Sequence, residues 1–406
     1  MKVPFSPPRI DEHTVEAVAE VLRSGWITTG PKTKQFEHDL ATYCGVERVL
    51  CLNSATAGLE LMLRWFGVGP GDEVIVPAYT YCATANVVVH CGAKPVMVDV
   101  GADFNMSPEA LRAAITERTK AVMPVDIGGW PCDYDAIRKV LNDDKVKSMF
   151  KPAGEHQEKL GRILLLSDAA HSFGAEYKGR KAGTLADVSV FSFHAVKNLT
   201  AAEGGAIAFS LPEVFKSEEI YRYLAIMSLH GQTKDALAKT SGSEWRYDVI
   251  DAGYKCNMTD IQAAIGALEL KRYDETLARR KQIFEQYRDV FGKKNWAIIP
   301  PFEEDGVRSS FHVFLLRIKD VNEEIRDAII KRIIEQQVFV NVHFTPLPLL
   351  TVYRERGYKM ADYPVAYEQF KSEISLPVYF DLTDEAIQRV TDVVVEAVEH
   401  CIVKVG

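Results

Sequence analysis

One lysine, Lys197, follows a run of β-branched and aromatic residues at 188–193 and is the strongest candidate for covalent chemistry in the chain. The run predicts a strand, and the Gly204-Gly205 pair lets the backbone turn into a second apolar strand at 206–209. A lysine held between two apolar strands is partly desolvated, so its pKa falls and its neutral amine can attack a carbonyl. A solvated loop lysine is the common alternative. Candidate residues elsewhere in the chain must decide between a reactive and a solvated Lys197.

A carboxylate, Asp168, ends another apolar stretch, at residues 162–168, and His171 follows directly after it. The stretch predicts a buried strand of a parallel sheet. A carboxylate at the end of such a strand is costly unless it meets a cation or a protonated ring. Asp168 is therefore a candidate partner for a positively charged group.

Two further turns are candidates for ligand binding. The apolar run at 49–52 leads into small and hydroxyl residues at 54–56, where the start of a helix offers free backbone N–H groups to a phosphate. Ser and Thr are also common helix caps for purely structural reasons. Tyr81 comes where the strand at 71–77 passes into a helix, so its ring either covers a ligand or packs into the core.

These four features all fall where predicted strands end, and ligands of open α/β sheets bind at those carboxyl ends. Pyridoxal 5′-phosphate (PLP) needs all four at once: donors for its phosphate, a face for its ring, an anion at its pyridine nitrogen and a lysine for its aldehyde. The sequence therefore predicts a PLP-dependent enzyme with Lys197 and Asp168 as catalytic residues and no metal site.

The composition of the 406 residues is that of an ordinary globular protein, with 47% hydrophobic and 26% charged residues. A net charge of −8 without any basic block argues against a nucleic-acid partner or a membrane surface. We find no stretch that predicts a signal peptide or a transmembrane helix. The seven cysteines are scattered without a C-x-x-C pair, which predicts free thiols in a reducing cytoplasm.

The elements that must position these residues alternate between strand and helix from residue 48 to 125, which predicts a parallel sheet with crossover helices. A helix at 12–24, capped by Asp11, precedes them and has apolar residues along one face. The polar segment at 142–161 is interpreted as a surface excursion. We predict a division of the chain into a large α/β domain at 1–255 and a smaller α+β domain at 256–406.

The second of these domains is expected to open with a long helix at 260–291 that bridges to the rest. The apolar patterns then predict three strands and three helices. The strands are at 309–318, 338–344 and 375–380, and the helices are at about 322–336, 361–371 and 383–403.

Several stretches of the chain resemble the DegT/StrS-type sugar aminotransferases in order and spacing, over nearly the whole length. They are residues 25–31, 54–58, 71–77, 168–171, 191–197, 203–205 and 253–260. The resemblance implies an α/β protein of fold type I, in which helices sandwich a large, mainly parallel seven-stranded sheet and a smaller C-terminal α+β domain follows. The chain is especially similar to UDP-4-amino-4-deoxy-arabinose aminotransferases, which aminate a UDP-4-keto-pentose for lipid A, and to enzymes acting on NDP-4-keto-6-deoxyhexoses.

The same resemblance implies a role for each matching residue. Lys197 would form a Schiff base with PLP and later move a proton between the substrate Cα and C4′ of the cofactor. Asp168 would pair with the pyridinium, Tyr81 would stack on the ring, and His171 would lie near its O3′ side. The four remaining residues would bind the cofactor phosphate or reach across a subunit interface. They are Ala55, Thr56, Ser192 and Asn257.

Of these last residues, the resemblance implies that the first three bind the phosphate and that Asn257 reaches in from a partner subunit. The active form would then be an obligate homodimer with shared sites. Two departures from the family pattern, the long segment 142–161 and the pair Ala201-Ala202, concern the substrate rather than the cofactor.

A related dehydratase branch carries histidine in place of the lysine, so Lys197 favours transamination. Glutamate would load the cofactor with an amino group, leaving as 2-oxoglutarate, and a nucleotide-linked keto sugar would receive it. The expected substrate contacts are Trp26, Thr28, Glu203 and His343. Two alternatives stay open: a PLP enzyme acting on another keto or amino substrate, and a non-catalytic sensor that binds the cofactor or a sugar nucleotide.

Overall fold

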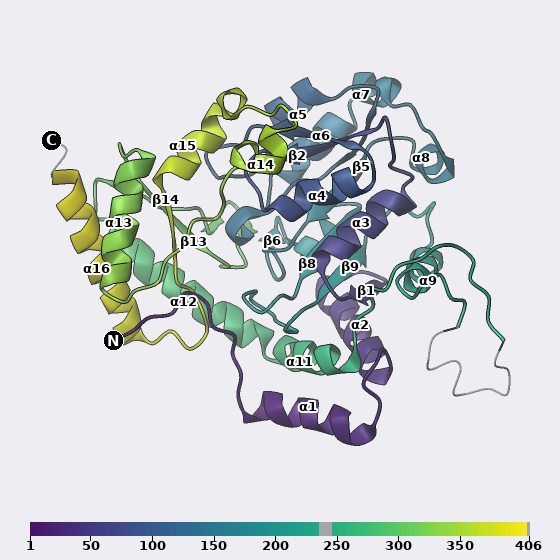
Figure 1. Ribbon diagram of the computed structural model, residues 1–406, viewed down its shortest axis with the longest axis horizontal. Helices are drawn as coiled ribbons and strands as arrows, with labels where there is room; N and C mark the ends of the chain where they lie inside the picture. Colours follow the sequence, from purple (N-terminus) through teal and green to yellow (C-terminus); the bar gives the residue numbers. More distant parts are fainter. Residues whose placement is uncertain (235–245, 404–406) are drawn as a thin grey trace.

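The computed structural model describes residues 1–234 and 246–403. Its centre is a seven-stranded sheet with the order β1-β9-β8-β5-β4-β2-β3, which lies among helices in the right-hand half of Figure 1. The strands are β1 (Val49–Leu52), β2 (Glu73–Pro77), β3 (Lys94–Val98), β4 (Thr119–Val122), β5 (Leu164–Asp168), β8 (Val188–Ser192) and β9 (Gly205–Phe209).

The strands from β3 to β8 run parallel, whereas β9 is antiparallel to both of its neighbours. Most are short runs buried on both faces, as parallel strands between helix layers are. The predicted mainly parallel seven-stranded sheet is thus confirmed. Its register sets the later geometry: Asp168 at the end of β5 pairs with Val190 of β8, and Ser192 at the end of β8 pairs with Gly205.

Helices precede and connect these strands. In α1 (Glu12–Ser24), Asp11 accepts the N–H of Thr14 at the start, and Gly25 ends the helix with a φ of 75°, which favours glycine. The others in this part are α2 (Pro31–Cys44), α3 (Ala55–Trp65), α4 (Cys82–His90), α5 (Pro108–Ala114), α6 (Tyr134–Leu141) and α9 (Ser217–Met227). The polar segment at 142–161 folds into two short helices, α7 (Asp144–Met149) and α8 (Glu155–Leu160).

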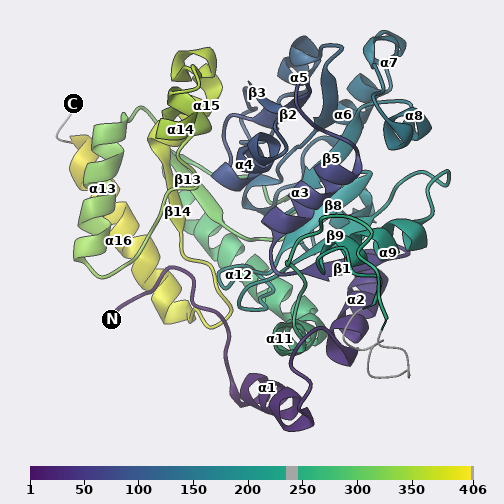
Figure 2. The ribbon, with the colours of Figure 1, turned by 45° about the vertical axis from the view of Figure 1, so that its right-hand side comes forward.

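The predicted long helix is present as two pieces, α11 (Asp260–Lys271) and α12 (Tyr273–Phe291), which part at Arg272. Thr259 begins the first piece through a capping box with Gln262. As Figure 2 shows, the two pieces run from beneath the large sheet toward the C-terminal elements.

The C-terminal elements surround a three-stranded sheet of β10 (Ala297–Ile298), β13 (Phe314–Ile318) and β14 (Glu373–Leu376). Helices α13 (Glu323–Glu335) and α16 (Asp384–Val403) pack against each other beside it, and α14 (Thr351–Arg354) and α15 (Pro364–Ser372) lie nearer the large sheet (Figure 1). The first residues of the chain also lie here, because Val3 pairs with Val338.

The strand predicted at 338–344 is wrong. Its alternating valines resemble a strand, but the segment makes only single bridges, between Val338 and Val3 and between Asn341 and Ser375. The backbone N–H of Val342 donates to its neighbour's side chain, and that of His343 donates to Glu373, so neither joins a ladder. The strand that pairs with β13 is β14 instead.

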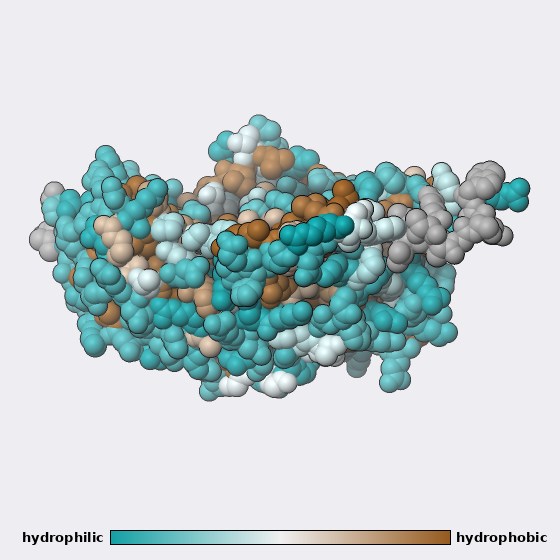
Figure 3. Space-filling model, turned by 90° about the horizontal axis from the view of Figure 1, so that it is seen from below, coloured by the Kyte–Doolittle hydropathy of each residue, from teal (hydrophilic) through white to brown (hydrophobic). Residues whose placement is uncertain are grey.

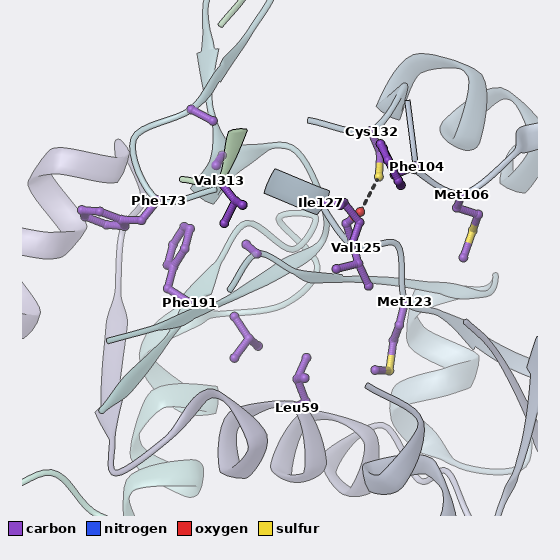
Figure 4. Packing of buried hydrophobic residues seen from close by; sticks show 14 of the residues in the cluster. Leu59, Phe104, Met106, Met123, Val125, Ile127, Cys132, Phe173, Phe191 and Val313 are labelled. Carbon is purple, nitrogen blue, oxygen red and sulfur yellow. Dashed lines mark hydrogen bonds between the residues drawn. The ribbon is translucent and has the colours of Figure 1, made fainter. Parts of the chain in front are cut away.

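A small four-stranded sheet that the sequence did not reveal joins distant parts of the chain. It consists of β11 (Glu303–Glu304), β12 (Val307–Arg308), β6 (Glu176–Tyr177) and β7 (Arg180–Lys181). The main core lies between the large sheet and its helices, where Leu59 of α3 and Phe191 of β8 are buried (Figure 4). In the described part of the chain, no helix is long and apolar enough to cross a membrane.

Candidate active site

A cavity of about 480 Å³ opens at the carboxyl edge of the large sheet, where the ends of β5 and β8 face the first turns of α3 and α4. Its volume is in the range of small-molecule sites. The cavity gathers most of the residues expected from the sequence. They are Ala55, Thr56, Tyr81, Asp168, His171, Ser192, Lys197, Glu203 and His343.

Lys197 lies in the turn between β8 and β9, where its backbone N–H donates to the carbonyl of His194. Burial lowers the pKa of Lys197 from 10.5 to about 8, and the negative charge of Asp168 opposes this shift. A substantial fraction of the amine is therefore neutral near physiological pH. Such an amine is a nucleophile that can attack an aldehyde carbon.

Asp168 is 5% exposed at the end of β5, and burial raises its pKa. Its Oδ2 accepts a hydrogen bond of 2.8 Å from Thr84 Oγ1, and its Oδ1 accepts the N–H of Ala170 at 3.3 Å. Among the described residues, no cationic side chain forms an ion pair with it. A buried carboxylate in this condition fits a ligand that brings its own positive charge, such as a protonated pyridine nitrogen.

The first turn of α3 forms the opposite wall of the cavity. Ser54 caps the helix by accepting the N–H of Ala57, and Ala55 and Thr56 follow with the free backbone N–H groups of a helix start. Gly205 permits the close approach of β9 to this turn, because a Cβ there would lie 2.3 Å from the nitrogen of Ala55. These donors fit a phosphate.

Three histidines form another wall. His171 accepts the N–H of Gly128 at Nδ1, 3.3 Å away, and its ring centre lies 4.4 Å from that of His312. His312 is fixed in turn by Asn198, whose Oδ1 lies 2.8 Å from its Nδ1. Burial is the main cause that lowers the pKa of His171, His312 and His343, so these rings are neutral at pH 7.

The ring of Tyr81 remains accessible in the cavity wall. The residue is 60% exposed and its ring centre lies 5.7 Å from that of Phe344. The ring therefore does not pack into the core, which was the alternative to covering a ligand. A face of the ring is free for another flat group.

The rest of the expected site residues lie outside this cavity. Trp26 donates its indole N–H to the carbonyl of Thr29, and Asn257 donates to the hydroxyl of the same threonine. Thr28 accepts the backbone N–H of Asp260. Asn257 instead lines a smaller cavity of about 160 Å³. Within one protomer, Trp26, Thr28 and Asn257 therefore do not meet Lys197.

The structure also brings residues to the site that sequence reasoning missed: Thr84, His312 and Phe344. Thr84 lies four positions after Thr80, and the two hydroxyl groups are 2.9 Å apart. A pair of threonines at a helix start is a signal that could have pointed to Asp168. His312 is one residue of an apolar run, so only its three-dimensional position reveals it.

The fold and the cavity together define a PLP-dependent enzyme with the architecture of the fold type I aminotransferases. The chain belongs to the DegT/DnrJ/EryC1/StrS aminotransferase family, whose model matches residues 8–395. The cofactor of this family is pyridoxal 5′-phosphate, and the buried carboxylate, the helix start and the lysine fit it.

Two sequence relatives cover nearly the whole chain. An uncharacterized protein of Methanocaldococcus jannaschii is 39% identical over 401 residues, which is 98% of this chain and 97% of the relative. The spore coat polysaccharide biosynthesis protein SpsC of Bacillus subtilis is 37% identical over 405 residues, again 98% of this chain and 97% of the relative.

Solved structures are similar over the same extent. Spr1654 of Streptococcus pneumoniae, assigned as a sugar aminotransferase, matches in its pyridoxamine-phosphate form with a TM-score of 0.95, 45% identity, and 98% of this chain and 100% of that chain covered. The Helicobacter pylori aminotransferase PseC, involved in the biosynthesis of pseudoaminic acid, matches with a TM-score of 0.85, 27% identity and the same coverage.

Proposed function

We propose that the protein transfers the amino group of glutamate to a nucleotide-linked keto sugar, an NDP-4-keto-6-deoxyhexose or a UDP-4-keto-pentose. The product would serve the synthesis of a surface polysaccharide or of lipid A sugars. The observation that carries this proposal is the pairing in one cavity of a partly neutral lysine, Lys197, with a buried carboxylate that has no ion-pair partner among the described residues, Asp168. The similarity to a polysaccharide biosynthesis protein and to a sugar aminotransferase supports the sugar substrate.

Bound PLP supplies a ring that accepts the electron pair released when a proton leaves the carbon beside the amino group. The residues of this chain would hold the cofactor and move the proton. The backbone N–H groups of Ala55 and Thr56 and the hydroxyl of Ser192 would bind its phosphate, while Asp168 would keep its pyridine nitrogen protonated.

Lys197 would act as the base and the acid. Its Nζ would hold the cofactor at the aldehyde carbon, with loss of water, and as a free amine it would carry a proton between the substrate carbon and C4′ of the cofactor. A pKa of about 8 suits both tasks, because a group with a pKa near the working pH gives and takes a proton with little cost. Tyr81 would cover one face of the ring and His171 would lie on its O3′ side.

The substrates would contact Glu203 and His343 from the same protomer, since both line the cavity. Glu203 is exposed at its mouth, with Oε1 3.6 Å from Nε2 of His194. Trp26, Thr28 and Asn257 would act on the site of a partner subunit, so the active protein would be a homodimer.

An exposed apolar surface supports the dimer. Val15 and Leu22 of α1 are 53% and 55% exposed although they lie on the apolar face of that helix, and Ile10 and Ile27 beside its ends are also exposed. Figure 3, seen from the side on which α1 projects in Figure 1, shows hydrophobic residues gathered there. Contiguous apolar surface of this kind is typical of protein interfaces.

A visible spectrum of the purified protein tests the proposal. The PLP-loaded wild type should absorb in the visible range, lose this absorbance when L-glutamate is added, and regain it with an NDP-4-keto-6-deoxyhexose or a UDP-4-keto-pentose. Lys197→Ala should lack the covalent absorbance, whereas Lys216→Ala, a change at an exposed lysine that precedes α9 and pairs with Glu219, should keep it.

The outcomes separate the alternatives. Protein that stays colourless with PLP would sink the cofactor assignment. Bound cofactor without a response to glutamate would favour a non-catalytic sensor. A response to glutamate with transfer only to other keto compounds would favour a different aminotransferase substrate.

A further inference from the structure

A buried carboxyl group, Glu373 at the start of β14, is linked to the cavity wall by a chain of side chains. Ser375 Oγ donates to Glu373 Oε1 at 2.5 Å and lies 2.9 Å from Nδ1 of His343. The second carboxyl oxygen accepts the backbone N–H of His343 at 3.0 Å. Glu373 and Ser375 are fully buried, so His343 is the only one of the three that lines the cavity.

The carboxyl group of Glu373 has unusual surroundings for a glutamate. The positive charge of Arg326 in α13 favours the ionised form of Glu373. The Arg326 guanidinium, however, hydrogen-bonds backbone carbonyls, including that of Glu373 itself. Burial therefore dominates and raises the pKa of Glu373 to about 8. The carboxyl group is protonated below this pH and ionised above it.

Two proton arrangements of the chain follow from this. When Glu373 is ionised, Ser375 donates to it and the serine oxygen accepts a hydrogen bond from Nδ1–H of His343, which leaves a lone pair on Nε2. When Glu373 is protonated, it can donate to Ser375, which then donates to Nδ1. The proton of the neutral imidazole then lies on Nε2.

We propose that Glu373 and Ser375 form a positioning relay that decides whether Nε2 of His343 offers the bound substrate a lone pair or an N–H. The inference rests on the proposed function, in which the cavity holds glutamate and the keto sugar in turn. A keto sugar offers both hydroxyl donors and carbonyl acceptors, so the two forms of His343 suit different groups of it. The imidazole itself stays neutral, because its own pKa is lowered to about 4.

Other titratable and charged groups face this chain. Around Glu373 they are Arg326, Arg317 as its neighbour in β13, and Tyr79, whose hydroxyl donates to the carbonyl of His343. Around His343 they are Lys197 and His171, and the charge of Lys197 opposes protonation of the imidazole. None of these contacts occupies the Nδ1 of His343, which is left to Ser375.

The pH dependence of the PLP-loaded enzyme tests the relay. In the wild type, kcat/KM for the keto sugar should show an inflection near pH 8, beyond that of Lys197 alone, and its size should be about tenfold because one hydrogen bond changes its direction. Glu373→Gln cannot titrate and should lose this inflection. Ser375→Ala breaks the chain and should lose it too, while Ser375→Thr, which keeps the hydroxyl, should restore it.

Ser372→Ala is the matched control. Ser372 is also buried and lies three residues away, but its hydroxyl hydrogen-bonds carbonyls of α15 and does not contact His343. This variant should keep the wild-type profile. A change in kcat/KM across pH 8 that is as large in both Glu373→Gln and Ser375→Ala as in the wild type would overturn the relay, as would a smaller change in the control.

A second measurement does not depend on turnover. Side-chain nitrogen shifts in ¹⁵N-histidine-labelled, PLP-loaded wild type report the tautomer of His343, with His343→Gln used to assign the signal. The proton should move from Nε2 to Nδ1 as the pH rises through about 8. A fixed tautomer between pH 6.5 and about 9.5 would overturn the relay. A tautomer that moves in a protein inactive toward keto sugars would keep the relay and count against the proposed function.

Discussion

Thr84 donates a hydrogen bond of 2.8 Å to Asp168 and is the only described side chain that does so. The threonine lies in the first turn of α4, the aspartate at the end of β5, and both are almost fully buried. Its hydroxyl is oriented by Thr80, 2.9 Å away. This contact favours the ionised form of Asp168, which burial alone would disfavour.

Replacing Thr84 by valine should weaken cofactor binding. The change keeps the shape but removes the donor, so the ionised carboxylate that should face the pyridine nitrogen becomes less favourable. A hydrogen bond to a charged group contributes roughly 1.5–3 kcal/mol, so the Kd for PLP should rise by about tenfold to a hundredfold. Absorbance titration of the apo protein with PLP measures it.

The matched control is Thr391→Val, which removes the hydroxyl of another buried threonine, in α16. PLP affinity should not change in this variant. An unchanged Kd in Thr84→Val would mean that the Thr84 hydroxyl does not support the charge of Asp168.

Gly205→Ala should disturb the phosphate end of the site. The added Cβ would lie 2.3 Å from the nitrogen of Ala55 and 2.4 Å from the carbonyl carbon of Ser54, so backbone must move. Overpacking of this kind costs about 1–3 kcal/mol, and here it displaces the first turn of α3. Both the free energy of unfolding and the affinity for PLP should fall.

Gly69→Ala is the control, because nothing lies within 4 Å of a Cβ at that position. Chemical denaturation and PLP titration should find both properties unchanged there. If Gly205→Ala lowered stability but left PLP affinity intact, the first turn of α3 would not be the phosphate seat.

The parts of the site that follow directly from strands could be predicted from the sequence. Lys197 and Asp168 each come after a short apolar run, and such runs in an alternating strand–helix pattern place their ends at one edge of a sheet. The helix start after β1 could be predicted for the same reason. For these residues, a position at the end of a predicted strand is enough to place them near one another in the structure.

Other parts depend on contacts between segments that no local pattern reveals. His312 lines the cavity and is held there by a hydrogen bond with Asn198, which is 114 positions earlier in the chain. The segment at 338–344 has the alternation of a strand, yet the buried carboxyl group of Glu373 accepts the hydrogen bond from the N–H of His343 that a ladder would need. A buried polar group of β14 therefore helps to set the backbone conformation of a segment that lies apart from it in the sequence.

Charges on the exposed face of α1 should separate the protomers. In the double variant Val15→Glu and Leu22→Glu, two exposed apolar side chains become carboxylates, which are costly to bury in an interface. Light scattering after size exclusion should give twice the chain mass of 45.4 kDa for the wild type and 45.4 kDa for the variant. Ser148→Glu, at an exposed position of α7, should leave the dimer intact. A wild type with the mass of one chain would contradict the proposed shared site.

The stability of the apo protein should report the titration of Lys197. The folded pKa of about 8 lies below the ordinary value of 10.5, so the unfolded chain binds more protons between these two pH values. The free energy of unfolding should therefore rise with pH in that window, by up to about 3 kcal/mol. In Lys197→Met, which cannot titrate, this rise should disappear and the protein should be more stable than the wild type at pH 7. Urea denaturation at several pH values measures both, and a wild-type slope that persists in Lys197→Met would show that the lysine is not the group desolvated on folding.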